Sequence, residues 1–139
     1  MHLPTPEEMH LFGLDFSKKL TDGQIVALFG PLGAGKTTLV QAMVAGLLGK
    51  NAPPVSSPTF VYLNVYENAD QAPIYHFDLY RLKNSREFIA CGFEEYLNSG
   101  SLCIIEWAER IEDLLPPQAI KLHIDYAENK GRTVRATNL

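Results

Sequence analysis

The chain of 139 residues lacks the features that mark secreted, membrane-spanning and nucleic-acid-binding proteins. It holds two cysteines, Cys91 and Cys103, outside any C-x-x-C pair, and we expect both to be reduced core residues of a cytoplasmic protein. No apolar run approaches the ~18 residues of a membrane span, and no basic segment followed by an apolar one marks a signal peptide. The net charge is -4 and the lysines and arginines are scattered, so no basic footprint favours direct binding of RNA or DNA.

The most informative segment that is present is a glycine-rich loop. Residues 30–37 read Gly-Pro-Leu-Gly-Ala-Gly-Lys-Thr and match G-x-x-x-x-G-K-[ST] at every fixed position. Glycines allow such a loop to turn its N–H groups toward phosphate oxygens, while Lys36 supplies positive charge and Thr37 a hydroxyl for Mg²⁺. The residues expected to bind the phosphates lie at the end of the loop and just after it: Gly33, Ala34, Gly35, Lys36, Thr37 and Thr38.

The segments on either side of the loop are typical of a strand and a helix. Residues 24–29 form a short apolar run, as expected for a central parallel strand covered on both faces. After the loop, apolar residues recur at helical spacing from Val40 to Leu48, and Gly49 follows as a stop signal. This order places a phosphate at a helix N-terminus, and a glycine turn that binds nothing would not explain the Lys-Thr pair.

The remaining segments predict a single α/β domain over residues 1–139. A Thr-Pro-Glu-Glu capping box opens a helix at Thr5, and short helices are expected at 85–91, 94–97 and after 106. Strands are expected at 59–66 and 74–77, joined as a hairpin by a turn at 68–73, and at 102–105, 120–126 and 133–137. The last is polar enough for an edge strand. The expected fold is a P-loop NTPase-like three-layer sandwich, its central sheet mostly parallel with antiparallel hairpin and edge strands.

Two carboxylates are candidates for the acid linked to the metal. Glu106 directly follows the apolar run 102–105, a Walker-B pattern with Glu where Asp is commoner, and Asp78 follows residues 74–77. We favour Glu106 as the carboxylate linked to Mg²⁺, because the strand before Glu106 is the more apolar and Mg²⁺ takes only one or two carboxylates. Thr37 is expected to share the metal with Glu106. Other interpretations remain: a solvated strand end for Glu106, and a helix cap or turn for Asp78.

Several further polar residues each have two interpretations. A hydroxyl in Ser-Pro-Thr at 57–59 either approaches the γ-phosphate, as in a switch loop, or makes a plain turn into a strand. His76 is more typical of a packed strand histidine than of a catalytic one. Trp107 is expected in a core or interface, and Arg81 and Arg110 on the surface rather than against phosphate.

Signatures of other nucleotide-binding classes are missing. The guanine-reading N-K-x-D has its nearest match in Asn-Lys-Gly-Arg at 129–132, which lacks the carboxylate. The transporter signature S-G-G-Q is absent, and so is an arginine-rich lid of the nucleotide-kinase kind. ATP is therefore favoured by elimination.

Four segments together resemble one family. The loop at 30–38, Ser-Pro-Thr-Phe at 57–60, His-Phe-Asp-Leu-Tyr-Arg at 76–81 and Ile-Glu-Trp-Ala-Glu-Arg at 105–110 occur in the order found in the bacterial TsaE (YjeE) family. The resemblance extends from about Thr5 to about Tyr126. It implies a P-loop ATPase that binds ATP and Mg²⁺, is needed to make threonylcarbamoyladenosine in tRNA, and works with two partner proteins, TsaB and TsaD.

The resemblance also implies roles for individual residues. Thr59 resembles the family's switch threonine, and His76 with Asp78 its second switch region, where Asp78 lies near the reacting phosphate. Glu106 resembles the metal-linked carboxylate, and Trp107 the adjacent tryptophan. The catalytic residues expected are Lys36, Thr59, Asp78 and Glu106, the metal-linked residues are Thr37 and Glu106, and the residues near the adenine are Thr5 and Pro6. Pro31 departs from the family, which commonly has an acidic residue there.

The leading hypothesis is therefore an ATPase subunit of the tRNA threonylcarbamoylation machinery. No residue is clearly a built-in arginine finger, so we expect slow hydrolysis by the chain alone and faster hydrolysis when TsaB–TsaD docks. Two alternatives remain. One is a small-molecule kinase, which needs an acceptor site and mobile arginines. The other is a nucleotide-gated binding module in which hydrolysis is incidental.

Overall fold

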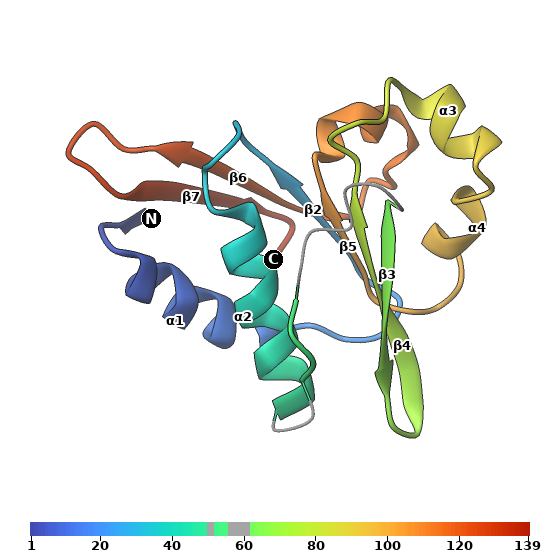
Figure 1. Ribbon diagram of the computed structural model, residues 1–139, viewed down its shortest axis with the longest axis horizontal. Helices are drawn as coiled ribbons and strands as arrows, with labels where there is room; N and C mark the ends of the chain where they lie inside the picture. Colours follow the sequence, from blue (N-terminus) through green and yellow to red (C-terminus); the bar gives the residue numbers. More distant parts are fainter. Residues whose placement is uncertain (50–51, 56–61) are drawn as a thin grey trace.

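The computed structural model describes residues 1–49, 52–55 and 62–139 (Figure 1). Its helices are α1 (Pro6–Ser17), α2 (Lys36–Leu48), α3 (Ser85–Ala90), α4 (Glu94–Leu97) and the 3₁₀ helix η2 (Ala108–Leu114). Its strands are β1 (His2–Leu3), β2 (Ile25–Phe29), β3 (Leu63–Asn68), β4 (Gln71–Asp78), β5 (Cys103–Glu106), β6 (Ile120–Tyr126) and β7 (Arg132–Thr137).

The strands of the described residues form one sheet in the order β1-β7-β6-β2-β5-β4-β3. The four inner strands β6, β2, β5 and β4 run parallel, and β3, β7 and β1 pair antiparallel to their neighbours. The carboxyl ends of the parallel strands therefore meet at one edge, where ligands of open α/β sheets bind. The expected mostly parallel sheet with antiparallel additions is confirmed.

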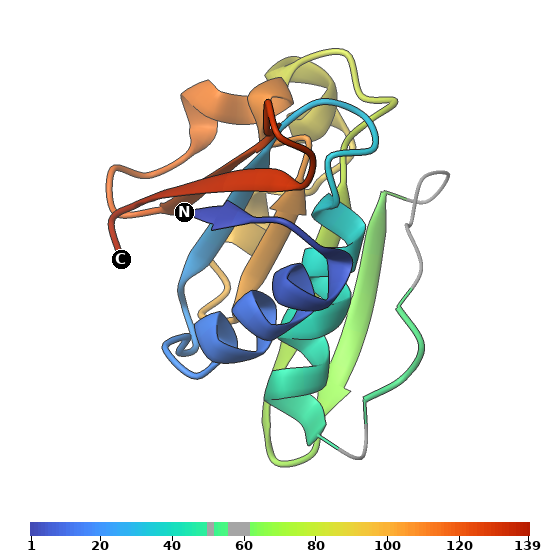
Figure 2. The same ribbon diagram turned by 90° about the vertical axis from the view of Figure 1, so that its left-hand side faces the viewer.

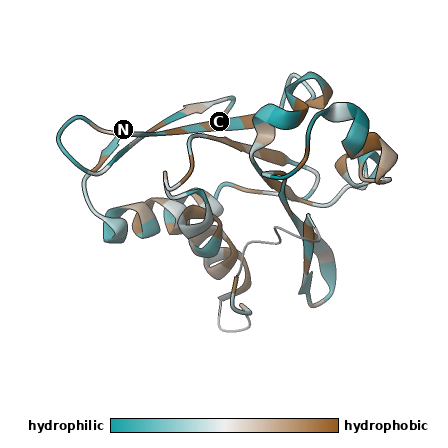
Figure 3. Ribbon diagram, turned by 45° about the horizontal axis from the view of Figure 1, so that its top comes forward, coloured by the Kyte–Doolittle hydropathy of each residue, from teal (hydrophilic) through white to brown (hydrophobic). Residues whose placement is uncertain are grey.

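Helices cover both faces of this sheet, as Figures 1 and 2 show. On β2, Val26 and Leu28 point into the core beneath α1 and α2, whereas Ala27 and Phe29 point into the core beneath α3 and η2. Successive side chains of a strand point to opposite faces of the sheet, so a strand that is apolar at every position has to be covered on both faces. Figure 3 shows the apolar character of α2, which lies against one of these faces. The three-layer α/β architecture is confirmed.

The N-terminal helix starts and packs as its sequence predicts. The Thr5 hydroxyl accepts a hydrogen bond from the Glu8 amide at 3.2 Å, which is the expected N-cap. A side chain at Gly13 would place its Cβ 2.5 Å from the Cβ of Ala42, so glycine there allows α1 to approach α2 closely.

The edge of the sheet differs from the prediction. The polar strand at the C-terminus, β7, is not an edge strand, because β1 pairs with it through His2↔Thr133 and Leu3↔Arg132. A strand of two residues has too few positions to show an alternating pattern, so the sequence did not indicate it. The predicted hairpin turn at 68–73 was also too long, since β4 already begins at Gln71.

The two cysteines differ in their surroundings. Cys103 is buried, as expected, but Cys91 is exposed at the C-terminal end of α3, so its assignment to the core was wrong. Both thiols are free. Within the described ranges, no helix combines the length and the apolar character that a membrane span requires.

Candidate functional site

The glycine-rich loop connects the carboxyl end of β2 to the first residue of α2. Gly33 and Gly35 have φ angles of 80° and 105°, in the left-handed region that glycine adopts most readily. A Cβ on Gly33 would lie 2.7 Å from the hydroxyl of Tyr126. Gly35 caps α2 without a side chain, so the unpaired N–H groups and the positive end of the helix dipole face the loop. The loop is therefore a cradle for an anion.

The loop's lysine folds back onto the loop itself. The Lys36 ammonium donates to the carbonyl oxygens of Gly30 and Pro31, the latter at 2.9 Å. It also lies 3.9 Å from the ring centroid of Trp107, within the range of a cation–π contact. Trp107 therefore lines the site and also packs, half-buried, against the core beneath η2. A phosphate oxygen in the loop would compete with the two carbonyls for this ammonium.

Burial and charge act on Lys36 in opposite directions. Burial lowers the pKa of the Lys36 ammonium from its ordinary value, while the negative charges of Glu109, Glu106 and Asp78 raise it. Desolvation is the larger of these effects. A negatively charged ligand beside Lys36 would favour the charged form further, so this lysine is suited to bind anions.

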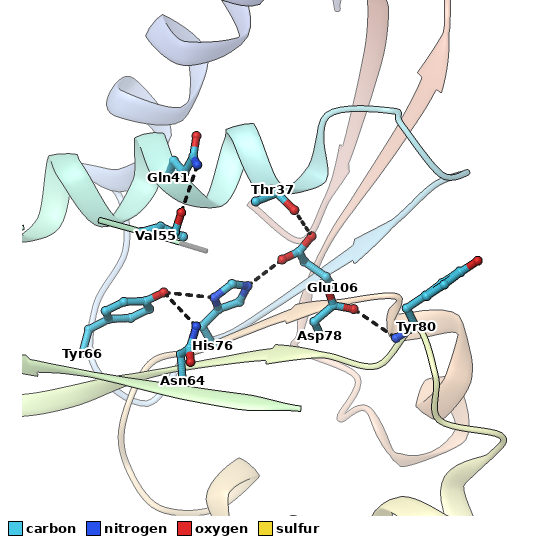
Figure 4. Close-up of polar contacts among 9 residues, drawn as sticks. All are labelled: Thr37, Gln41, Val55, Asn64, Tyr66, His76, Asp78, Tyr80 and Glu106. Carbon is cyan, nitrogen blue, oxygen red and sulfur yellow. Dashed lines mark hydrogen bonds and ion pairs between the residues drawn. The ribbon is translucent and has the colours of Figure 1, made fainter. Parts of the chain in front are cut away.

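A buried carboxylate joins the loop's threonine to a strand histidine (Figure 4). The Thr37 hydroxyl donates to Oε1 of Glu106 at 2.9 Å, and Nε2 of His76 lies 2.6 Å from Oε2 of the same carboxylate. Glu106 is 2% exposed and His76 is fully buried. His76 is therefore packed, as a strand histidine usually is, and it also holds a site carboxylate in place.

The hydrogen bonds continue from His76 into the β3–β4 hairpin. The Tyr66 hydroxyl lies 3.3 Å from Nδ1 of His76, and the Asn64 amide donates to the Tyr66 oxygen at 3.4 Å. All of these bonds are satisfied when His76 carries its proton on Nε2, because Nδ1 then accepts from Tyr66 while Nε2 donates to Glu106. Strand β3 is thereby connected to the glycine loop through Glu106 and Thr37.

The second candidate carboxylate lies beside the first. Asp78 and Glu106 are partners in the parallel register of β4 and β5, at the carboxyl end of both strands. Asp78 is 4% exposed, and its Oδ1 accepts a hydrogen bond from the Tyr80 amide at 3.0 Å. The turn-type bond expected for Asp78 is present, and the residue also faces the same cavity as Glu106.

Two cavities meet at the loop. The larger, about 500 Å³, is lined by Lys36, Thr37, Asp78, Glu106 and Trp107. The smaller, about 260 Å³, lies against the N-terminal segment and is lined by residues that include Thr5, Pro6, Met9 and Ala34. Gly33, Gly35 and Thr38 line both. An elongated ligand with an anionic end can therefore occupy both cavities across the loop.

The donor set limits how a metal can be held. The described residues contain no group of three or more His, Cys, Asp and Glu side chains that would bind a metal ion without other ligands. A metal at this site would take a hydroxyl, one carboxylate and oxygens of a ligand or water, which is the coordination that Mg²⁺ prefers.

The structure brings together most of the residues predicted for the site. Lys36, Asp78 and Glu106 share the larger cavity with Thr37, and Thr5 and Pro6 line the smaller one. The predicted switch threonine Thr59, with the rest of 57–59, lies outside the described residues.

Other residues near the cavities were missed or differ from expectation. Arg110 is half-buried rather than on the open surface, donates to the Tyr80 carbonyl at 3.2 Å and lies 5.6 Å from the Trp107 ring centroid. Tyr126 and Arg132, which contact the loop, were not predicted at all. Only the pairing of strands distant in sequence places them there, so no local pattern indicated them.

Comparison with known proteins identifies the family to which the chain is similar. The family model described as "Threonylcarbamoyl adenosine biosynthesis protein TsaE" matches residues 3–134. Proteins named "tRNA threonylcarbamoyladenosine biosynthesis protein TsaE" are similar over most of the chain. The one from Rickettsia typhi is 40% identical over 133 residues, 95% of this chain and 90% of its own. The one from Bacillus subtilis is 36% identical over 115 residues, 83% of this chain and 70% of its own.

A solved structure shows the same fold. The crystal structure of Bacillus subtilis YdiB superimposes with a TM-score of 0.77 at 27% sequence identity, covering 96% of this chain and 80% of that one. The family model covers nearly the whole chain, and the relatives match it at up to 41% identity over most of their own length. The chain therefore belongs to the TsaE family.

Proposed function

We propose that this chain binds Mg-ATP across the two joined cavities and hydrolyses it during the formation of threonylcarbamoyladenosine in tRNA. The observation that carries the proposal is the 2.9 Å hydrogen bond between Thr37, at the start of α2, and Glu106, at the end of β5, beside Lys36. A loop lysine, a hydroxyl and a strand-end carboxylate are the groups that P-loop ATPases use. The names of the similar proteins supply the role in tRNA modification.

The residues present fit a magnesium ion. Each oxygen of Glu106 accepts one hydrogen bond, from Thr37 or from His76, and keeps a lone pair that can accept from a metal-bound water. The Thr37 oxygen donates its proton to Glu106 and so presents its own lone pairs to the cavity. Thr37 and Glu106 would hold the ion there, where its charge would offset that of the β- and γ-phosphates.

The loop and its neighbours hold the rest of the nucleotide. The amides of the loop and of the start of α2 bind phosphate oxygens, and Lys36 leaves the carbonyls of Gly30 and Pro31 to contact the β- and γ-phosphates. The adenine occupies the smaller cavity beside Thr5 and Pro6. Either Asp78 or the predicted switch residue Thr59 orients the attacking water.

Hydrolysis by the chain alone is slow in this proposal. Arg132 is bonded to carbonyls of the loop, and Arg110 to the carbonyl of Tyr80, so neither is placed to contact the reacting phosphate. A docked TsaB–TsaD complex completes the site and accelerates turnover. Such completion by an added arginine is worth orders of magnitude in other nucleotide hydrolases.

The test is calorimetric titration of Mg-ATP into the purified chain and into Lys36→Ala. We expect at least tenfold weaker binding or slower turnover in the variant, equivalent to ~1.4 kcal/mol, because the charge at the phosphates is lost. Lys18→Ala, which removes an exposed lysine from the end of α1, is the control and should match the unmodified chain. ATPase rates with and without TsaB–TsaD follow. No heat from ATP with folded protein would refute the proposal, and rapid turnover by the isolated chain would refute the role of the partners.

A further inference from the structure

We propose that Arg132 and Tyr126, on the β6–β7 hairpin, position the phosphate-binding amides of the glycine loop. The inference rests on the proposed function and adds two positioning residues to it. We call these two residues with their bonds to the loop the hairpin clasp. It joins parts of the chain that are more than ninety positions apart in sequence.

The clasp engages three successive carbonyl groups of the loop. The Tyr126 hydroxyl donates to the Leu32 carbonyl at 2.6 Å. The Arg132 guanidinium donates from Nη2 to the Gly33 carbonyl and from Nε to the Ala34 carbonyl, both at 3.1 Å. Two donors fixed in one plane hold both oxygens at once, which a lysine cannot do. The guanidinium also lies 4.4 Å from the Tyr126 ring centroid, so the two clasp residues fix each other.

Holding these carbonyls also sets the direction of the amides. In a planar trans peptide the C=O and N–H groups point to opposite sides. The carbonyls of Leu32 and Ala34 share their peptides with the amides of Gly33 and Gly35, and both glycines line the larger cavity. The amide between them, on Ala34, bonds instead to the Pro31 carbonyl at 3.2 Å and closes the turn. By holding the carbonyls of the same two peptides, the clasp therefore orients the amides of Gly33 and Gly35.

The loop needs such a support because three of its residues, Gly30, Gly33 and Gly35, are glycines. Glycine has the widest conformational freedom of any residue, so local preference does not fix the backbone at these three positions. The hairpin is a rigid support, because β6 pairs with β2 directly before the loop, with Phe29 opposite His123. Its contact with the loop is close, since a Cβ on Gly30 would lie 2.3 Å from the Ile124 carbonyl oxygen.

Arg132 has a second possible role, which the experiment separates from the first. It lines the smaller cavity, beside Thr5 and Pro6, where the adenine is proposed to lie. If Arg132 acted only as a wall for the base, its loss would weaken binding of ATP but not of inorganic tripolyphosphate, which has no base. If it positions the loop amides, both ligands lose affinity by a similar factor.

The experiment measures binding of ATP and of tripolyphosphate, each with Mg²⁺, by calorimetry. Arg132→Ala should weaken both about tenfold, and Tyr126→Phe, which keeps the ring and removes only the hydroxyl, about fivefold. Arg132→Lys should recover only part of the loss. Arg135→Ala is the matched control, because Arg135 is an exposed arginine on the same strand, and it should bind both ligands as the unmodified chain does. Melting temperatures show that each variant is folded, and Tyr126→Phe and Arg132→Lys carry the test if Arg132→Ala does not fold.

The outcomes separate this inference from the proposed function. If the unmodified chain binds ATP and all clasp variants bind both ligands as Arg135→Ala does, the clasp is overturned and the ATP site stands. A loss confined to ATP also overturns it, in favour of a wall for the base. If the unmodified folded chain binds neither ligand, the proposed function fails and the clasp fails with it.

Discussion

The buried contact between His76 and Glu106 gives a quantitative prediction. His76→Phe keeps most of the side-chain volume but removes the partner of Oε2, which lies 2.6 Å away on a carboxylate that is 2% exposed. A hydrogen bond from a neutral donor to a charged group typically contributes about 1.5–3 kcal/mol, and its removal leaves one oxygen of the buried carboxylate without a donor. Glu106 keeps its bond to Thr37, so we expect a loss of about 2 kcal/mol in the free energy of unfolding.

The assay is urea denaturation of the four members of a double-mutant cycle made with Glu106→Gln. When the carboxylate is a neutral amide, loss of His76 leaves no buried charge, so its cost should fall to about 1 kcal/mol. Tyr66→Phe, which removes the bond to the other ring nitrogen, should cost about 1 kcal/mol. His10→Phe, at an exposed position of α1, should change stability by less than about 0.5 kcal/mol. Equal costs of His76→Phe with and without Glu106→Gln would refute the reasoning.

Two further predictions concern the N-cap and the thiols. Thr5→Ala should lower the free energy of unfolding, measured by urea denaturation, by about 1 kcal/mol, because the Glu8 amide loses its acceptor. Thr5→Ser keeps the hydroxyl and should leave the free energy of unfolding unchanged. Equal losses in the two variants would exclude capping as the cause. Burial raises the pKa of the Cys103 thiol to about 12, so at pH 8 a thiol reagent should modify Cys91 alone in the folded chain and both cysteines after unfolding. Reaction of both thiols in the folded chain would contradict the burial of Cys103. Since the folded state holds the Cys103 proton more tightly than the unfolded state, the contribution of this thiol to stability is complete below pH 9 and is lost as the pH rises toward 12.

The sequence allowed prediction of those parts of the fold that depend on local patterns. The strand before the loop, the helix after it and the Thr5 cap were each predicted close to their observed positions, because alternation, helical spacing and capping are properties of a few adjacent residues. The apolar runs that precede them indicated Asp78 and Glu106, the resemblance to the TsaE family implied roles for both, and the parallel register of β4 and β5 places them side by side.

The features that were missed depend on pairing between distant strands. The bond between Tyr66 and His76 requires the antiparallel register of β3 and β4, and the contact of Arg132 with the loop requires β7 to lie beside β6. Neither register can be read from the composition of a single strand. Cys91 was wrongly assigned to the core for a similar reason, because its exposure depends on how the end of α3 lies relative to the sheet.

The short strand at the N-terminus has a consequence for the order of assembly during folding. His2 pairs with Thr133, so the wall of the smaller cavity is complete only when these two segments, distant in sequence, have met. Closing so long a stretch of chain is entropically costly, and contacts of this kind usually form late. During synthesis on the ribosome the glycine loop can therefore emerge and begin to fold well before Gly131 and Arg132 are available to complete the smaller cavity beside it.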